Sequence, residues 1–159
     1  SNDYLMKKIV LSIVFFIGSM AVQAQELTWE TNFDKAAEIS MKTKKPILLF
    51  FTGSDWCGWC IRLQKEVLKT PEFAAWAKDK VVLVEVDFPR RSPQLPETQQ
   101  QNNQLQQLFA VQGFPTIWFT RPSTVDGKIN LDKLGSTGYV AGGPSKWIEG
   151  ANQILSVKQ

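Results

Sequence analysis

The two cysteines of this chain, Cys57 and Cys60, are separated by two residues in the segment GSDWCGWC. At the start of a helix this spacing places both side chains on one face, close enough for a disulfide bond. A bridge across so short a loop removes little entropy from the unfolded chain, so a purely structural role would contribute little stability. A zinc site would need two further ligands, and the chain contains no histidine. The spacing therefore favours a reactive dithiol, and we expect no metal site.

Reactivity follows from where these cysteines are expected to lie. If Cys57 occupies the first turn of a helix, unpaired backbone N–H groups and the helix dipole stabilise its thiolate. Cys60 lies one turn further along and is expected to be more buried. Cys57 can then attack a substrate disulfide, and Cys60 can displace the reduced product. This two-step exchange needs no other side chain and no cofactor.

The surrounding sequence predicts an α/β domain in which helices and strands alternate. The first half is expected to contain a helix over residues 33–44 with Asn32 as its cap, a buried central strand over 47–51, helices over 57–69 and from Pro71 toward 78, and a strand over 81–86. The second half is expected to contain a loop over 89–104 that becomes helical near Asn103, a helix continuing to 111, a strand over 116–119, a turn at 126–127, a partner strand over 134–140 and a helix over 144–157. No repeat or second domain is visible.

The composition fits one compact domain whose chemistry does not use imidazole. With 159 residues and 43% apolar side chains, the chain can bury a sizeable core without disulfides. The formal charge of +3 is spread without a long basic run, so we expect no nucleic-acid binding. The absence of histidine excludes Ser-His-Asp and Cys-His catalysis.

The first 24 residues have the pattern of a secretory signal peptide. Lys7 and Lys8 precede an apolar run over residues 9–17, and small residues lead to a cleavage position after Ala24. A membrane span needs about 20 apolar residues, so no stable membrane anchor is expected. Residues 1–5 precede Met6 and are interpreted as a cloning remnant. We therefore expect a domain over residues 25–159 that is exported to an oxidising compartment, a bacterial periplasm.

Two motifs resemble the thioredoxin superfamily. The segment KKPILLFFTGSDWCGWC looks like that family's strand and active-site helix, and VQGFPT, residues 111–116, looks like its cis-proline loop. The resemblance covers about residues 29–157. It implies a thioredoxin-like fold with a central mixed β-sheet flanked by helices, and an exported thiol-disulfide oxidoreductase. It also implies that Cys57 is the nucleophile, Cys60 the resolving thiol and Pro115 a cis-proline facing them.

The residues next to these motifs are candidates for substrate binding. The resemblance implies that the backbone of Phe114 lies where a substrate peptide can pair in extended form. Trp56 corresponds to the tryptophan that thioredoxins commonly place before the nucleophile, and Gly58 and Trp59 lie between the cysteines. An exposed indole at Trp59 would contact apolar segments of unfolded substrates.

The chain departs from the thioredoxin pattern at the buried proton relay. The position of the usual buried aspartate is assigned to Phe51, and that of its lysine partner to Leu83. Glu85 is a possible replacement as proton acceptor, but a lone polar residue in a strand is also expected to face an edge or solvent, and both interpretations stay open. Three other charged residues near the site are expected to be solvated: Asp55, Arg90 and Arg91. For the two arginines, docking of a partner protein is the alternative.

Trp59 also bears on the direction of exchange. Strong oxidants of the superfamily often carry histidine before the resolving cysteine, and an indole cannot donate a cationic hydrogen bond. We expect a monomeric reductase or isomerase that acts on protein substrates with disulfides or thiols and is served by an unidentified redox partner protein. The competing interpretation is a redox-inert binding module with the same fold. A thiol peroxidase would carry a lone cysteine with a nearby arginine, and the sequence does not offer that arrangement.

Overall fold

The computed structural model describes residues 2–4 and 26–157. The apolar run and the cleavage position of the expected signal peptide lie outside the described residues. From Trp29 onward the elements are β1 (Trp29–Glu30), α2 (Phe33–Thr43), β2 (Ile47–Thr52), α3 (Gly58–Leu63), η1 (Gln64–Leu68), α4 (Pro71–Lys80), β3 (Val82–Asp87), α5 (Pro96–Leu108), β4 (Thr116–Val125), β5 (Lys128–Thr137) and α6 (Gly143–Ser156). In the described part of the chain, no helix has the length and apolar character needed to cross a bilayer.

The strands form one mixed sheet in the order β1-β3-β2-β4-β5. The central strand β2 pairs in parallel with β3 and antiparallel with β4. All six residues of β2 are buried. A strand covered on both faces reads as a continuous apolar run, which is the pattern that predicted it. The expected buried central strand is confirmed.

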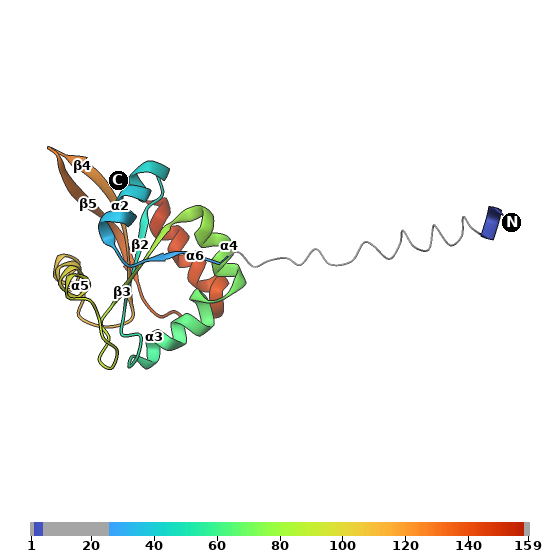
Figure 1. The fold of residues 1–159 in the computed structure, drawn as a ribbon, viewed down its shortest axis with the longest axis horizontal. Helices are drawn as coiled ribbons and strands as arrows, with labels where there is room; N and C mark the ends of the chain where they lie inside the picture. The colour runs from blue at the N-terminus through green and yellow to red at the C-terminus, as the bar shows by residue number, and fades with distance from the viewer. Residues whose placement is uncertain (1, 5–25, 158–159) are drawn as a thin grey trace.

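Helices cover both faces of this sheet (Figure 1). On one face, α2 and α5 contribute Phe33 and Leu105 to a buried cluster. On the other face, α3, η1, α4 and α6 form a second cluster that contains Cys60, Phe73 and Trp147. The molecule therefore has three layers, and the cysteines belong to the layer of α3, η1, α4 and α6. This is the mixed sheet flanked by helices that the sequence predicted.

Helix starts follow the capping residues in the sequence. The Asn32 side chain accepts a hydrogen bond from the Lys35 N–H at 3.0 Å, at the start of α2. The Thr70 hydroxyl accepts one from the Phe73 N–H at 3.3 Å, at the start of α4. Each cap satisfies a backbone donor that has no partner within its helix. The caps predicted at both helices are confirmed.

The helix that follows the cysteines is not a uniform α-helix. The expected helix over residues 57–69 is an α-helix from Gly58 to Leu63 and a π-helix from Gln64 to Leu68. The Lys69 N–H donates to the Gln64 carbonyl at 2.8 Å, a bond between residues five apart. Helical periodicity of apolar residues does not reveal such a local change in hydrogen bonding.

The glutamine-rich segment is helical earlier than expected. α5 begins at Pro96 rather than near Asn103, with proline at its first position and Glu97 in its first turn. Proline suits the first helical position and glutamine is a good helix former, so the expected loop over residues 89–104 was wrong from Pro96 onward. The Asn102 side chain also donates to the Asp87 carbonyl at 2.9 Å, which ties α5 to the end of β3.

The β4–β5 hairpin has longer strands than expected, and its second strand begins earlier in the sequence. The turn at Asp126 and Gly127 is confirmed, and both residues have positive φ, as a tight hairpin turn requires. Because the turn sets the register, β5 begins at Lys128 rather than at Leu134, and it ends at Thr137. Tyr139 therefore lies in the segment between β5 and α6. Figure 1 shows the tip of this hairpin extending beyond the helices.

Candidate active site

The two cysteines lie where β2 leads into α3. Cys57 is the N-cap of α3, one position before the expected first turn, and its sulfur accepts a hydrogen bond from the Cys60 N–H at 3.2 Å. The residues form a disulfide, with their Cα atoms 5.2 Å apart. Cys57 retains 6% of its surface and Cys60 none. The helix terminus and the deeper burial of Cys60 agree with the sequence-based expectation.

The loop before Cys57 is folded tightly around Trp56. The Cys57 N–H donates to the Gly53 carbonyl at 2.8 Å. A Cβ atom at Gly53 would overlap the Trp56 indole, so glycine lets the ring lie against the backbone at the end of β2. The indole N–H donates to the Phe88 carbonyl at 2.8 Å, which joins this loop to the segment that follows β3.

Asp55 holds that neighbouring segment in place. Its carboxylate accepts hydrogen bonds from the backbone N–H groups of residues 90–92 and from the Ser92 hydroxyl, at 2.8 to 3.1 Å. These bonds, that from Arg90 foremost, lower the pKa of Asp55 to about 2. Asp55 is a partly exposed loop residue, as expected, but its carboxylate also accepts hydrogen bonds from backbone groups distant in sequence.

Arg90 is exposed but also has a defined contact. Its guanidinium lies 3.5 Å from the centroid of the Trp56 ring, the geometry of a cation–π interaction. Arg90 is therefore exposed, as expected, and also contacts the Trp56 ring. Arg91 is exposed, and its backbone N–H donates a hydrogen bond to Asp55.

The Phe114–Pro115 peptide bond is cis, as the resemblance implied. The Phe114 ring packs edge-on against Trp56, with centroids 5.8 Å apart, and stacks on Phe88 at 5.2 Å. These contacts bring the proline loop beside the loop that carries Cys57. Trp56, Phe114 and Pro115 are thus brought together at the cysteine end of the sheet.

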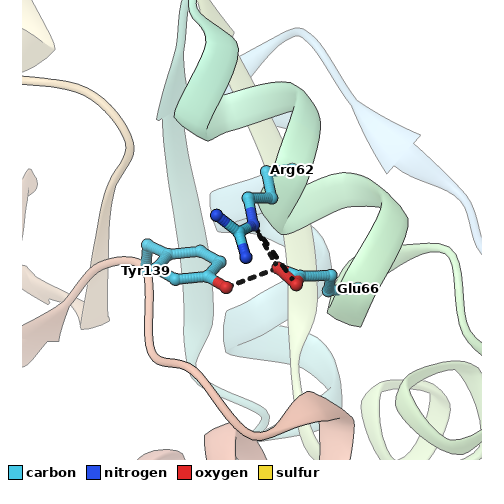
Figure 2. Close-up of polar contacts among 3 residues, drawn as sticks. All are labelled: Arg62, Glu66 and Tyr139. Atoms are coloured by element: carbon cyan, nitrogen blue, oxygen red, sulfur yellow. Dashed lines mark hydrogen bonds and ion pairs between the residues drawn. The ribbon is translucent and has the colours of Figure 1, made fainter.

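Trp59 projects from the cysteine turn and keeps 54% of its surface exposed. Its ring lies 5.0 Å from that of Tyr139, which reaches it from the segment between β5 and α6. Figure 2 shows Arg62 and Glu66, from the helix that follows the cysteines, meeting Tyr139 at the Glu66 carboxylate. Sequence reasoning missed these three residues. The four-residue spacing of Arg62 and Glu66 is a local signal that could have revealed their ion pair, whereas no local pattern points to Tyr139. Gly58 is also exposed.

Glu85 lies on the cysteine side of the sheet. It is half-buried on β3, an interior strand, and shares a pocket with Thr52 and Cys60. Burial, and secondarily the charge of Asp87, raises the pKa of Glu85 above its usual value of 4.5. β1 pairs with Leu83 and Val84 of β3 and ends there, so Glu85 lies beside an open side of the strand, and both interpretations of Glu85 stay open.

Phe51 is buried on the face of the sheet away from the cysteines. Its side chain lies in the cluster under α2 and α5, on the face away from the cysteines, while Leu83 lies in the cysteine-side cluster. Thr52, the next residue of β2, lines the pocket beside Cys60 instead. Side chains alternate along a strand, so a shift of one residue changes the face. Phe51 and Leu83 therefore lie on opposite faces of the sheet and do not face each other as a buried pair would.

Comparison with known proteins identifies the family. A family model described as thioredoxin-like matches residues 28–122. The disulfide bond reductase DsbH of Chlamydia pneumoniae is 36% identical over 137 residues, covering 86% of this chain and 78% of that protein. This chain belongs to the thioredoxin-like family.

Solved structures of thioredoxin-like proteins agree with this assignment. A DsbH oxidoreductase matches with a TM-score of 0.75 at 35% identity, covering 89% of this chain and 92% of that one. A thioredoxin from Thermus thermophilus, with a TM-score of 0.60 at 16% identity and coverage of 83% and 89%, shares the fold. With its Cys57–Cys60 disulfide, this thioredoxin-like chain is a thiol-disulfide oxidoreductase. The sequence-based predictions of fold and reaction class are confirmed.

Proposed function

We propose that this protein is a disulfide reductase acting on exported proteins, with Cys57 as nucleophile and Cys60 as resolving thiol. The observation that carries the proposal is the position of the pair. Cys57 lies at the helix terminus and retains surface, whereas Cys60 is fully buried behind it. The similarity to a disulfide bond reductase supports this direction over isomerisation.

The reaction balances with a dithiol as the electron source. The Cys57 thiolate attacks one sulfur of a substrate disulfide, that bond breaks, and the released substrate thiolate takes up a proton. Cys60, once deprotonated, attacks the Cys57 sulfur, so the mixed disulfide breaks and the Cys57–Cys60 disulfide forms. Two electrons have then passed to the substrate, which leaves as a dithiol. A reduced protein dithiol, the unidentified redox partner, must return the enzyme to its reduced state.

Glu85 is the candidate proton acceptor for Cys60. Both residues line the same pocket, and the raised pKa of Glu85 brings the carboxyl closer to neutral pH, where it can exchange a proton. A location near the cysteines supports a substrate-binding role for five other residues, of which Gly58 and Trp59 are exposed and Trp56, Phe114 and Pro115 are partly exposed.

Export is part of the proposal. Lys7, Lys8 and the apolar run over residues 9–17 support a signal peptide that follows the cloning remnant and ends at Ala24. A monomeric thioredoxin-like domain over residues 25–159 follows it. An oxidising compartment such as a bacterial periplasm would supply disulfide-bonded protein substrates. The mass of the protein recovered from the exporting cell measures cleavage after Ala24, and an uncleaved chain would contradict it.

The test is to trap the mixed disulfide. The Cys60→Ala variant should accumulate disulfide-linked complexes through Cys57, because attack proceeds and resolution does not. The complexes are measured by nonreducing gel electrophoresis and mass spectrometry. The matched Cys57→Ala variant should form none. Equal trapping by both variants, or by neither, would contradict the assigned roles.

A further inference from the structure

Trp59 has a fixed aromatic neighbour although it is largely exposed. Trp59 lies between the two cysteines in the sequence. The centroid of its ring is 5.0 Å from that of the Tyr139 ring, and the two ring planes form an angle of 54°. Tilted pairs at this distance are favourable for aromatic rings. The Trp59 ring therefore has a defined contact with Tyr139, while 54% of the residue's surface remains exposed to a ligand.

Tyr139 is held in turn by a charged pair on the helix. Its hydroxyl donates to the Glu66 carboxylate at 2.5 Å, and the Arg62 guanidinium donates to the same carboxylate at 3.2 Å (Figure 2). The hydrogen bond from Tyr139 is the largest cause that lowers the pKa of Glu66, and the hydrogen bond from Arg62 also lowers it. The bond to Glu66 in turn raises the pKa of Tyr139. At neutral pH, Tyr139 therefore remains a donor to an ionised carboxylate.

Arg62 also joins the two rings. The centre of its guanidinium lies 5.1 Å from the Trp59 ring centroid and 5.3 Å from that of Tyr139. Tyr139 and Arg62, which both contact the Trp59 ring, therefore restrict its orientation before any substrate binds. An indole fixed in this way loses less conformational freedom on binding than a free one.

We infer that Tyr139 is a positioning residue that fixes Trp59 as a contact surface for an apolar side chain next to the substrate cysteine. The Tyr139–Glu66–Arg62 cluster would thereby give the enzyme a preference among protein disulfides. This inference rests on the proposed function and specifies which substrates that site prefers.

The test uses two peptide disulfides that differ only at the residue next to the cysteine, leucine in one and asparagine in the other. The wild-type protein should reduce the leucine peptide with the higher kcat/KM. Tyr139→Ala should lower kcat/KM for that peptide roughly two- to tenfold, mainly through KM, and change the asparagine peptide little. In the Trp59→Ala background, Tyr139→Ala should have no further effect, because the tyrosine acts through the indole.

Graded variants keep the test decisive if Tyr139→Ala folds poorly. Tyr139→Phe keeps the ring and removes the bond to Glu66, and Glu66→Gln keeps an acceptor without charge; both should give a smaller loss of preference. Glu38→Gln, on α2 across the sheet, is the charge-matched control. Equal losses for both peptides, unchanged preference, or additive effects of Trp59→Ala and Tyr139→Ala would overturn the inference. Reduction of 2-hydroxyethyl disulfide by the wild-type protein tests the proposed function separately.

Discussion

Glu85 shows how one residue's surroundings alter its chemistry. Its side chain is half-buried, and Asp87, two residues along the same strand, adds a like charge. Lys69, after η1, acts in the opposite direction, but burial is the larger effect and the pKa of Glu85 is raised. A carboxyl in this position keeps its proton to higher pH in the native state than in the unfolded chain.

Replacing Glu85 with glutamine should change the pH dependence of stability. Above pH 4.5, the unfolded chain loses this proton before the native state does, so the native state binds more protons and the free energy of unfolding falls as pH rises. Glu85→Gln removes that decrease. As pH rises above 4.5, the free energy of unfolding of the variant should therefore increase relative to that of the wild type. Urea unfolding from about pH 4 to 8 measures the effect. An identical pH slope in both proteins would contradict it, and Glu38→Gln is the control.

At the scale of elements, the segment after β3 is held against the cysteine loop from several sides. Asp55 binds the backbone of residues 90–92, and the Trp56 indole N–H donates to the Phe88 carbonyl. The Gln94 side chain donates to the Asp87 carbonyl at 3.1 Å. A proline-rich segment without regular structure is thus ordered by hydrogen bonds from its neighbours, and it brings Arg90 to the Trp56 ring.

Asp55→Asn should loosen this segment. The amide of asparagine is uncharged and offers one acceptor oxygen in place of two, so hydrogen exchange at residues 90–92 should become faster. The native pKa of Asp55 is lowered from 3.8 to about 2, so its contribution is present above pH 3.8 and lost as pH falls toward 2. The stability difference between wild type and variant should therefore shrink in acid. Asp79→Asn is the matched control. Unchanged hydrogen exchange at residues 90–92 in Asp55→Asn would show that the Asp55 carboxylate does not hold this segment in place.

At the scale of the whole molecule, the disulfide lies within one layer of the fold, at the start of the helix that follows the central strand. Cys60 is packed in the cluster of α3, η1, α4 and α6, and Cys57 caps the helix that follows β2. The redox state of the pair is therefore linked to the stability of the domain. A strongly oxidising dithiol protein is one whose reduced form is stabilised. Trp59, in place of a histidine, provides no cationic hydrogen bond for that purpose.

The oxidised protein should consequently be the more stable form. We expect a higher melting temperature with the Cys57–Cys60 disulfide intact, and a reduction potential nearer the roughly −270 mV of thioredoxin than the roughly −120 mV of a strong oxidase. Thermal unfolding of both forms and equilibration with a glutathione buffer measure these quantities. A more stable reduced form would reverse the proposed direction of exchange.

The sequence by itself determined the features that depend on near neighbours. The cysteine spacing, the caps at Asn32 and Thr70, the apolar run of β2 and the turn at Asp126 each involve residues within a few positions, and the structure confirms them. Propensity and periodicity describe such local interactions.

Only the tertiary structure decided which residues surround the cysteines. Asp55 meets residues 35 to 37 positions away, and Tyr139 meets Glu66 across 73 positions. The choice between Phe51 and Thr52 required knowing which face of β2 each occupies. These contacts depend on strand register and on the packing of distant elements, which no short window of the sequence contains.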